Sequence, residues 1–204
     1  MNNPCQVPDL ARFENAIRKF DEENSRDPNL ENVESRMVPR ELIYAQWLTN
    51  WVLKLKPDAS EELLLAARSQ HICRWLHPRD SYPMTRAGYL KWRENLKKFH
   101  ARRAGEILAN TGYPQAVIAR VQSLNLKENF PADPDSCVLE DALCLVFLER
   151  QLAPLAARST EEQMVNALRK AWQKMTPNGR TLASAIPYAP REAALIRKAL
   201  EKGG

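Results

Sequence analysis

The sequence predicts an all-α protein, a compact multi-helix bundle, on three observations. Leucine, alanine, arginine, lysine and glutamate outnumber the β-branched residues, and the 204 residues include only 6 glycines, a balance that favours helix. Apolar residues recur at intervals of three and four along long segments, as on one face of a helix. The 14 prolines fall mostly between these segments, where they end helices. No segment alternates apolar and polar residues long enough to predict a strand.

Four helices are expected in the first half of the chain. The segment 8–23 carries an apolar stripe that includes Phe13 and Phe20, and "NSRDPN" ends it. The next helix, 39–55, opens at Pro39, a favourable residue in a first turn. Ser60 is a candidate N-cap for a third helix over 60–76. After the proline-bounded loop "HPRDSYP", a long fourth helix covers 85–110, with Thr85 as a candidate cap.

Four more helices are expected after the "TGYP" turn, over 115–124, 138–152, 160–175 and 190–202. The helix over 160–175 has the clearest start signal, because Thr160 and Gln163 have the spacing of a capping box. "TPNG" is expected to end it.

Composition excludes several classes of protein. The net charge of +5 and the pI near 9.1 permit an anionic partner, but no block of like charge and no RNA-binding motif supports nucleic-acid binding. No apolar run is long enough to span a bilayer, and "MNNPCQVPDL" lacks the pattern of a signal peptide. The four cysteines show no CxxC spacing, so reduced core thiols and a cytoplasmic protein are expected. A homo-oligomer is compatible with the sequence.

Four of the expected helices each carry one metal-capable side chain on an apolar face. A buried carboxylate or imidazole without a partner is costly, and the cost falls when such groups meet. Two histidines and two carboxylates in a helical core suit a divalent metal ion of unspecified identity. The proposed ligands are Glu41, His71, His100 and Asp141, with Glu140 nearby as a candidate catalytic base.

Structural roles remain open for each of these residues. A histidine on an apolar face commonly donates to a backbone carbonyl. The carboxylates all fall in first helical turns, where the helix dipole favours an anion without any function.

The segment after His71 combines arginines with aromatic residues. Arginine binds phosphate or carboxylate with paired N–H groups, and aromatic faces suit a planar ring. A solvated helix face with structural aromatics is the alternative. The candidate residues for binding an anionic small molecule are Arg74, Arg79, Arg86, Tyr82 and Trp92.

Long motifs, among them "PRELIYAQWLTNWVLKLKPDASEELLLAARSQHICRW" and "LEDALCLVFLERQL", resemble the domain of unknown function 4202 family (DUF4202). The resemblance covers about 13–175, so the chain is interpreted as a single domain, 1–204, with a helical C-terminal appendage over about 176–204. A more distant resemblance is to HD-domain metal-dependent phosphohydrolases. "LLLAARSQHIC" is similar to their second motif, although Gln70-His71 stands where that family has His-Asp.

The HD resemblance implies a metal-dependent hydrolase of a small phosphorylated or nucleotide-like substrate. Glu41 would take the place of the first histidine, Asp141 that of the late aspartate, and His100 that of an additional histidine. The alternative is a non-catalytic module that binds an anionic metabolite or a protein partner and retains a degenerate metal site. The missing His-Asp pair favours this alternative.

Overall fold

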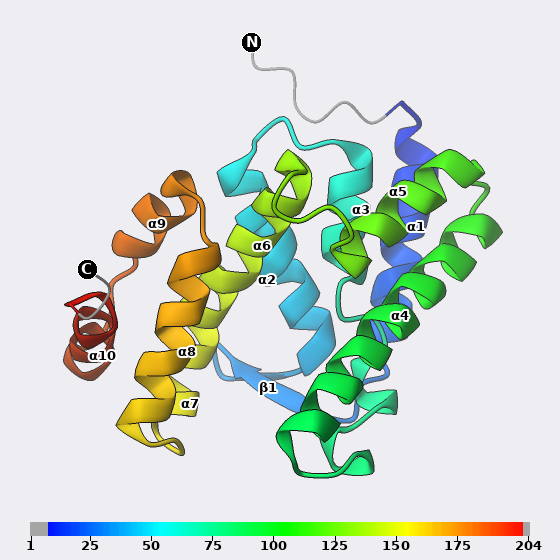
Figure 1. Cartoon of the computed structure of the whole chain (residues 1–204). Helices are drawn as coiled ribbons and strands as arrows, with labels where there is room; N and C mark the ends of the chain where they lie inside the picture. The colour runs from blue at the N-terminus through cyan, green and yellow to red at the C-terminus, as the bar shows by residue number, and fades with distance from the viewer. Residues whose placement is uncertain (1–7, 202–204) are drawn as a thin grey trace. The chain divides into compact units, whose positions relative to one another are not determined.

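The computed structural model describes residues 8–201 and confirms the all-α class (Figure 1). Its residue contacts group into two compact units, 1–136 and 137–204, each of which is described by itself. The interpretation as one domain stays a prediction. The expectations for Cys5, the N-terminal segment and the last residue of the helix over 190–202 lie outside the described residues.

The first unit is built from five helices, a hairpin and the start of a sixth helix. Fully buried side chains from separate helices, including Phe20, Leu48, Leu63 and Leu108, form its core. The elements are α1 (Leu10–Asn24), β1 (Leu30–Val33), β2 (Arg36–Pro39), α2 (Arg40–Leu55), α3 (Glu61–Ser69), the 3₁₀ turns Arg74–Leu76 and Arg79–Ser81, α4 (Arg86–Asn110) and α5 (Gln115–Leu126). The next helix, α6 (Pro134–Val146), begins here and continues into the second unit.

The hairpin was not expected from the sequence. β1 and β2 pair in an antiparallel register that places Val33 opposite Arg36. Glu34 and Ser35 between them have positive φ angles of 49° and 67°, as in the two-residue turns that match strand twist. Each strand has only four residues, too few to show an alternating pattern.

The prediction of one helix over 60–76 is wrong beyond Ser69, where α3 ends. Ser60 does cap this helix, since its side chain accepts from the N–H of Leu63. At the other end, Cys73 adopts a left-handed conformation with φ 53° and its N–H donates to Asn24 Oδ1. No glycine or proline marks this end of the helix in the sequence. The hydrogen bond to Asn24, in α1, stabilises the turn instead. His71 therefore lies in a turn rather than on a helix face.

The second unit contains the rest of α6, the π-helical turn Phe147–Gln151, α7 (Leu152–Ala156), α8 (Glu161–Lys174), α9 (Pro177–Ser184) and α10 (Pro190–Glu201). The predicted capping box of Thr160 and Gln163 is confirmed. The helix expected over 138–152 begins earlier, at Pro134, because Asp133 Oδ1 accepts the N–H of Asp135. The short helix α9 was not expected; Thr176 caps it.

Candidate functional site

Three of the residues singled out in the sequence lie together inside the first unit. Glu41 is in the first turn of α2, His71 in the turn after α3, and His100 in α4. His71 Nδ1 lies 3.5 Å from Glu41 Oε2, and the centres of the two imidazole rings are 5.9 Å apart. We refer to these three side chains as the Glu41–His71–His100 cluster.

Glu41 is held in place through its backbone. Pro39, at the N-cap of α2, makes no side-chain capping bond. The buried carboxylate of Asp27 takes that role, because its Oδ2 accepts the N–H of Glu41 at 3.0 Å. Asn29 in turn donates to Asp27 Oδ1 from its N–H and its side chain. The start of α2 is thereby fixed, and the Glu41 side chain with it.

His71 is positioned by two neighbouring side chains. Tyr44, one helical turn after Glu41, stacks on the imidazole with ring centres 4.3 Å apart and an interplanar angle of 13°. Arg74 Nη1 lies 3.4 Å from His71 Nε2. A guanidinium only donates, so Nε2 is the accepting nitrogen and Nδ1, which faces Glu41, carries the proton. Burial, followed by the charges of Arg74, Lys127 and Arg93, holds the pKa of His71 well below its usual value.

His100 has its protonation pattern set by the backbone. Its Nδ1 lies 2.8 Å from the carbonyl oxygen of Ile72, which accepts only, so Nδ1 carries the hydrogen. Burial lowers the pKa of His100, and His71 lowers it further, so the ring is neutral at pH 7. The lone pair then lies on Nε2, which is buried and has no hydrogen-bond partner among the described residues.

Glu41 supplies a second unsatisfied acceptor. Its Oε2 is also buried without a hydrogen-bond partner within residues 8–201, and the nearest guanidinium atom, Arg74 Nε, is 3.9 Å from Oε1. Burial raises the pKa of Glu41 to about 7, although the charge of Arg74 opposes this shift. Unsatisfied buried acceptors are uncommon, and a pair of them fits a cation or a hydrogen-bond donor.

A complete protein ligand set is not formed around these atoms. Across the described range, no three His, Cys, Asp or Glu side chains are placed as a group that could hold a metal ion. A cation at this cluster would therefore depend on oxygen atoms from water or a bound molecule for the rest of its coordination.

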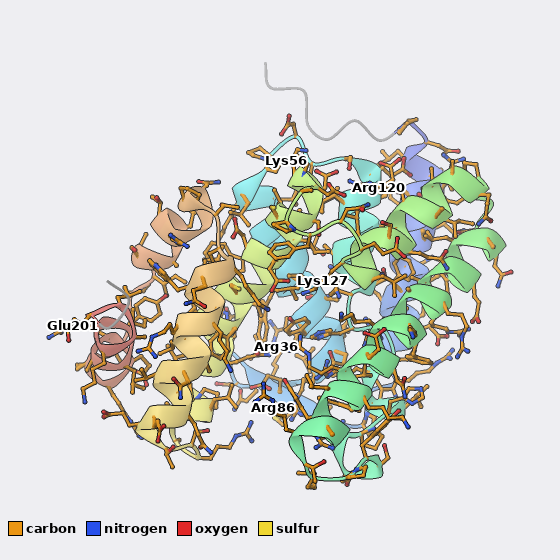
Figure 2. The ribbon with its side chains drawn as sticks, in the orientation of Figure 1. Arg36, Lys56, Arg86, Arg120, Lys127 and Glu201 are labelled. Carbon is orange, nitrogen blue, oxygen red and sulfur yellow. The ribbon has the colours of Figure 1, made fainter. Side chains whose placement is uncertain are left out.

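Three cationic side chains influence the cluster electrostatically. Arg74, Arg93 and Lys127 each lower the pKa of His71 through their charge. Lys127 follows α5 with a left-handed backbone, φ 60° (labelled in Figure 2). A neutral imidazole pair with three cations acting on it is an electrostatic setting that favours an anion.

The two carboxylates predicted from α6 belong to the second unit. Asp141 accepts the N–H of Thr176 at 2.8 Å and also its hydroxyl, at the start of α9. Glu140 Oε1 pairs with Lys174 Nζ at 3.0 Å. Burial raises the pKa of Asp141. Both residues thus have partners within 137–204, and their roles as metal ligand and base stay predictions.

Most of the predicted anion-binding residues support the loop before α4. Arg79 donates to the carbonyl oxygens of Tyr82 and Pro83. The Tyr82 hydroxyl accepts from Asn95. Trp92 is buried, donates to the His77 carbonyl, and lies 5.0 Å under the guanidinium of Arg74. Of this set, Arg74 alone contacts the cluster. The side chain of Arg86, at the start of α4, makes no hydrogen bond or ion pair with a described residue.

Sequence reasoning missed three residues that shape the cluster. Tyr44 follows Glu41 at a helical spacing of three, so a stacking partner could have been sought there. Asp27 and Lys127 lie far from the cluster in the chain and follow no motif, so nothing in the sequence pointed to them.

No helix within the described range has the length and apolar character needed to cross a membrane.

No curated protein and no solved structure matches the chain. The sequence does match the family described as Domain of unknown function (DUF4202) over residues 14–196, which is most of its length. The chain therefore belongs to the DUF4202 family.

Proposed function

We propose that this protein is a metal-dependent hydrolase of a small phosphorylated or nucleotide-like molecule, with its site at the Glu41–His71–His100 cluster. The observation that carries the proposal is the pair of buried acceptors, His100 Nε2 and Glu41 Oε2, that have no hydrogen-bond partner among the described residues. Two free electron pairs in the interior favour a cation, and the cationic side chains that act on His71 favour an anionic substrate beside it.

The residues of the cluster have distinct proposed roles. Glu41 and His100 would hold the divalent metal through Oε2 and Nε2, with water or phosphate oxygens completing its coordination, and His71 would orient the Glu41 carboxylate from 3.5 Å. When bound, the metal supplies a water of lowered pKa and neutralises charge on the phosphoryl group. Arg74, Arg93 and Lys127 orient the phosphate and offset its charge. Water attacks the phosphorus, the bond to the leaving oxygen breaks, and the proton passes from the water through Glu41 to the leaving oxygen.

The test is release of inorganic phosphate from a panel of phosphate monoesters and nucleotides, with Mg²⁺, Mn²⁺, Co²⁺ or Zn²⁺ added. Glu41→Gln should lower kcat/KM by about 100-fold or more, since it removes a ligand and proton acceptor. His77→Asn is the matched control, because His77 packs on Phe99 and is not part of the cluster. A chain that binds metal yet releases no phosphate from any substrate would show that the proposal is wrong.

A second candidate is a module that binds an anionic metabolite without turnover. It is favoured by the absence, among the described residues, of a three-residue metal ligand set. Thermal denaturation with inorganic phosphate and with nucleotides, in EDTA, separates the two functions. Stabilisation that survives EDTA and is lost in Arg74→Ala, with no phosphate release under any condition, would support the module.

We also propose a cytoplasmic location. Cys73 supports a reducing compartment, since its thiol forms no disulfide with a cysteine of the described residues and donates to Glu23 Oε2 at 3.3 Å. Cell fractionation with a cytoplasmic marker enzyme tests this proposal, and recovery of the chain with an extracellular or membrane fraction would contradict it.

A further inference from the structure

Exposed apolar side chains gather on the loop before α4 and on the first turns of that helix. The exposed fractions are 59% for Leu76, 78% for Met84, 40% for Tyr89 and 56% for Leu90. Met84 is the most exposed large apolar residue in the described range. Single exposed apolar residues are ordinary, whereas several in one short stretch indicate an interaction surface.

Unpaired cations accompany these side chains. Arg86 and Lys91 are exposed, and their side chains make no hydrogen bond or ion pair with any described residue. Arg86 lies at the beginning of α4 (Figure 2). Arg86 and Leu90 share one face of α4 at a spacing of four, and we call the exposed side chains of this stretch, Leu76, Met84, Arg86, Tyr89, Leu90 and Lys91, the α4 patch.

The backbone under the α4 patch is held firmly. Trp92 is buried and donates to the His77 carbonyl, and Arg79 bridges the carbonyl oxygens of Tyr82 and Pro83. Gly88 lies so close to the Pro83 carbonyl that a Cβ atom would overlap it. A surface that is already ordered loses little conformational entropy on binding.

We propose that the α4 patch docks a protein segment of acidic, amphipathic character, with apolar side chains on Met84 and Leu90 and carboxylates on Arg86 and Lys91. Charge complementarity carries the choice of partner, because unpaired cations flank the apolar residues. Glu94, in the same stretch, is paired with Lys97 and Lys98, so it does not offset the charges of Arg86 and Lys91. A second copy of the α4 patch would bring like charges together.

The test uses the full chain and a fluorescent 18-residue amphipathic helical peptide of leucine and glutamate. A peptide with lysine in place of every glutamate is the charge control. Fluorescence anisotropy should show that the Leu/Glu peptide binds about tenfold or more tightly than the Leu/Lys peptide, and that added salt weakens its binding.

Variants locate the binding surface. Met84→Ser/Leu90→Ser should lower the affinity for the Leu/Glu peptide about tenfold or more. Lys91→Glu should also lower this affinity, because the new carboxylate repels the peptide's glutamates. Leu10→Ser/Leu53→Ser is the matched control, since both leucines are exposed elsewhere, and circular dichroism checks that each variant is folded. Equal binding of the two peptides, no effect of the α4 variants, or tighter binding to phosphatidylserine vesicles or polyuridylate than to the Leu/Glu peptide would each overturn the proposal.

Discussion

The Nδ1 atom of His100 lies 2.8 Å from the carbonyl oxygen of Ile72. This contact fixes the tautomer of a buried, neutral imidazole and directs its lone pair to Nε2, which has no hydrogen-bond partner in the described part of the chain. Ile72 directly follows His71, so the same turn that places one histidine of the cluster also orients the other. The arrangement makes the ligand role and the structural role of His100 separable by substitution.

His100→Asn should separate the two roles. The asparagine amide can replace Nδ1 as donor to Ile72, but nothing replaces the Nε2 lone pair. We expect the free energy of unfolding of the metal-free protein to change by about 1 kcal/mol or less, while calorimetric affinity for Mn²⁺ or Zn²⁺ falls about tenfold or more. His77→Asn should leave both unchanged. Unaltered metal affinity in His100→Asn would remove His100 from the proposed ligand set.

The two histidines of the cluster should make the protein sensitive to acid. Burial lowers the pKa of both rings in the folded state, so the unfolded chain binds more protons below about pH 6.5 and stability falls as the pH decreases. Each histidine contributes up to about 1.4 kcal/mol per pH unit in that range. Urea unfolding of metal-free protein between pH 7.5 and 5.5 measures the slope.

A double variant provides the control for the acid effect. His71→Asn/His100→Asn lacks both imidazoles of the cluster but retains the opposing contribution of Glu41, so its stability should rise as the pH falls over the same range. His77→Asn should keep the wild-type slope. If the double variant lost stability in acid as steeply as the wild type, His71 and His100 would not be the cause of the acid sensitivity.

Glu41 should destabilise the metal-free protein in alkaline solution. Its folded pKa is about 7 against an ordinary value of 4.5, so the folded state binds the extra proton and stability declines as the pH rises from 4.5 through 7. Above pH 7 the resulting loss of stability amounts to roughly 3 kcal/mol. Glu41→Gln should therefore be the more stable protein at pH 8, and the difference should vanish near pH 4.5. Equal free energies of unfolding for the wild type and Glu41→Gln at pH 8 would contradict the raised pKa of Glu41.

Asp141 should stabilise the second unit through Thr176. Its carboxylate accepts both the N–H and the hydroxyl of that residue, so Asp141→Ala should cost about 1–3 kcal/mol. A double-mutant cycle with Asp141→Asn and Thr176→Val should show a coupling energy above about 0.5 kcal/mol. If Asp141→Asn instead abolished metal binding with no coupling to Thr176, the residue would be a ligand as first predicted.

The convergence at the cluster was predictable only in outline. Glu41 and His100 could be identified because each interrupts an apolar helical stripe, a pattern visible in one dimension. His71 was identified by the same argument, which placed it on the face of a helix. It lies instead in the turn beyond the end of α3, and this turn brings it into the cluster. The turn that carries it depends on Asn24, from a helix about fifty residues earlier.

Asp141 has a hydrogen-bond partner that the sequence did not reveal. A carboxylate on a nearly all-apolar helix predicts a buried partner, and the sequence offered the histidines. The structure shows Thr176 as its partner, at the start of a helix that the sequence pattern did not reveal.

By itself the sequence determined the helical class, most helix boundaries, the Thr160 cap and the family of the chain, since these depend on local propensity, periodicity and long contiguous motifs. Only the tertiary structure decided where α3 ends, which arginines support a loop rather than face the cluster, and which buried polar atoms have no hydrogen-bond partner within residues 8–201. Those outcomes depend on contacts between residues that are distant in the chain. A one-dimensional pattern records that a polar side chain is buried, whereas its partner is set by how the elements pack.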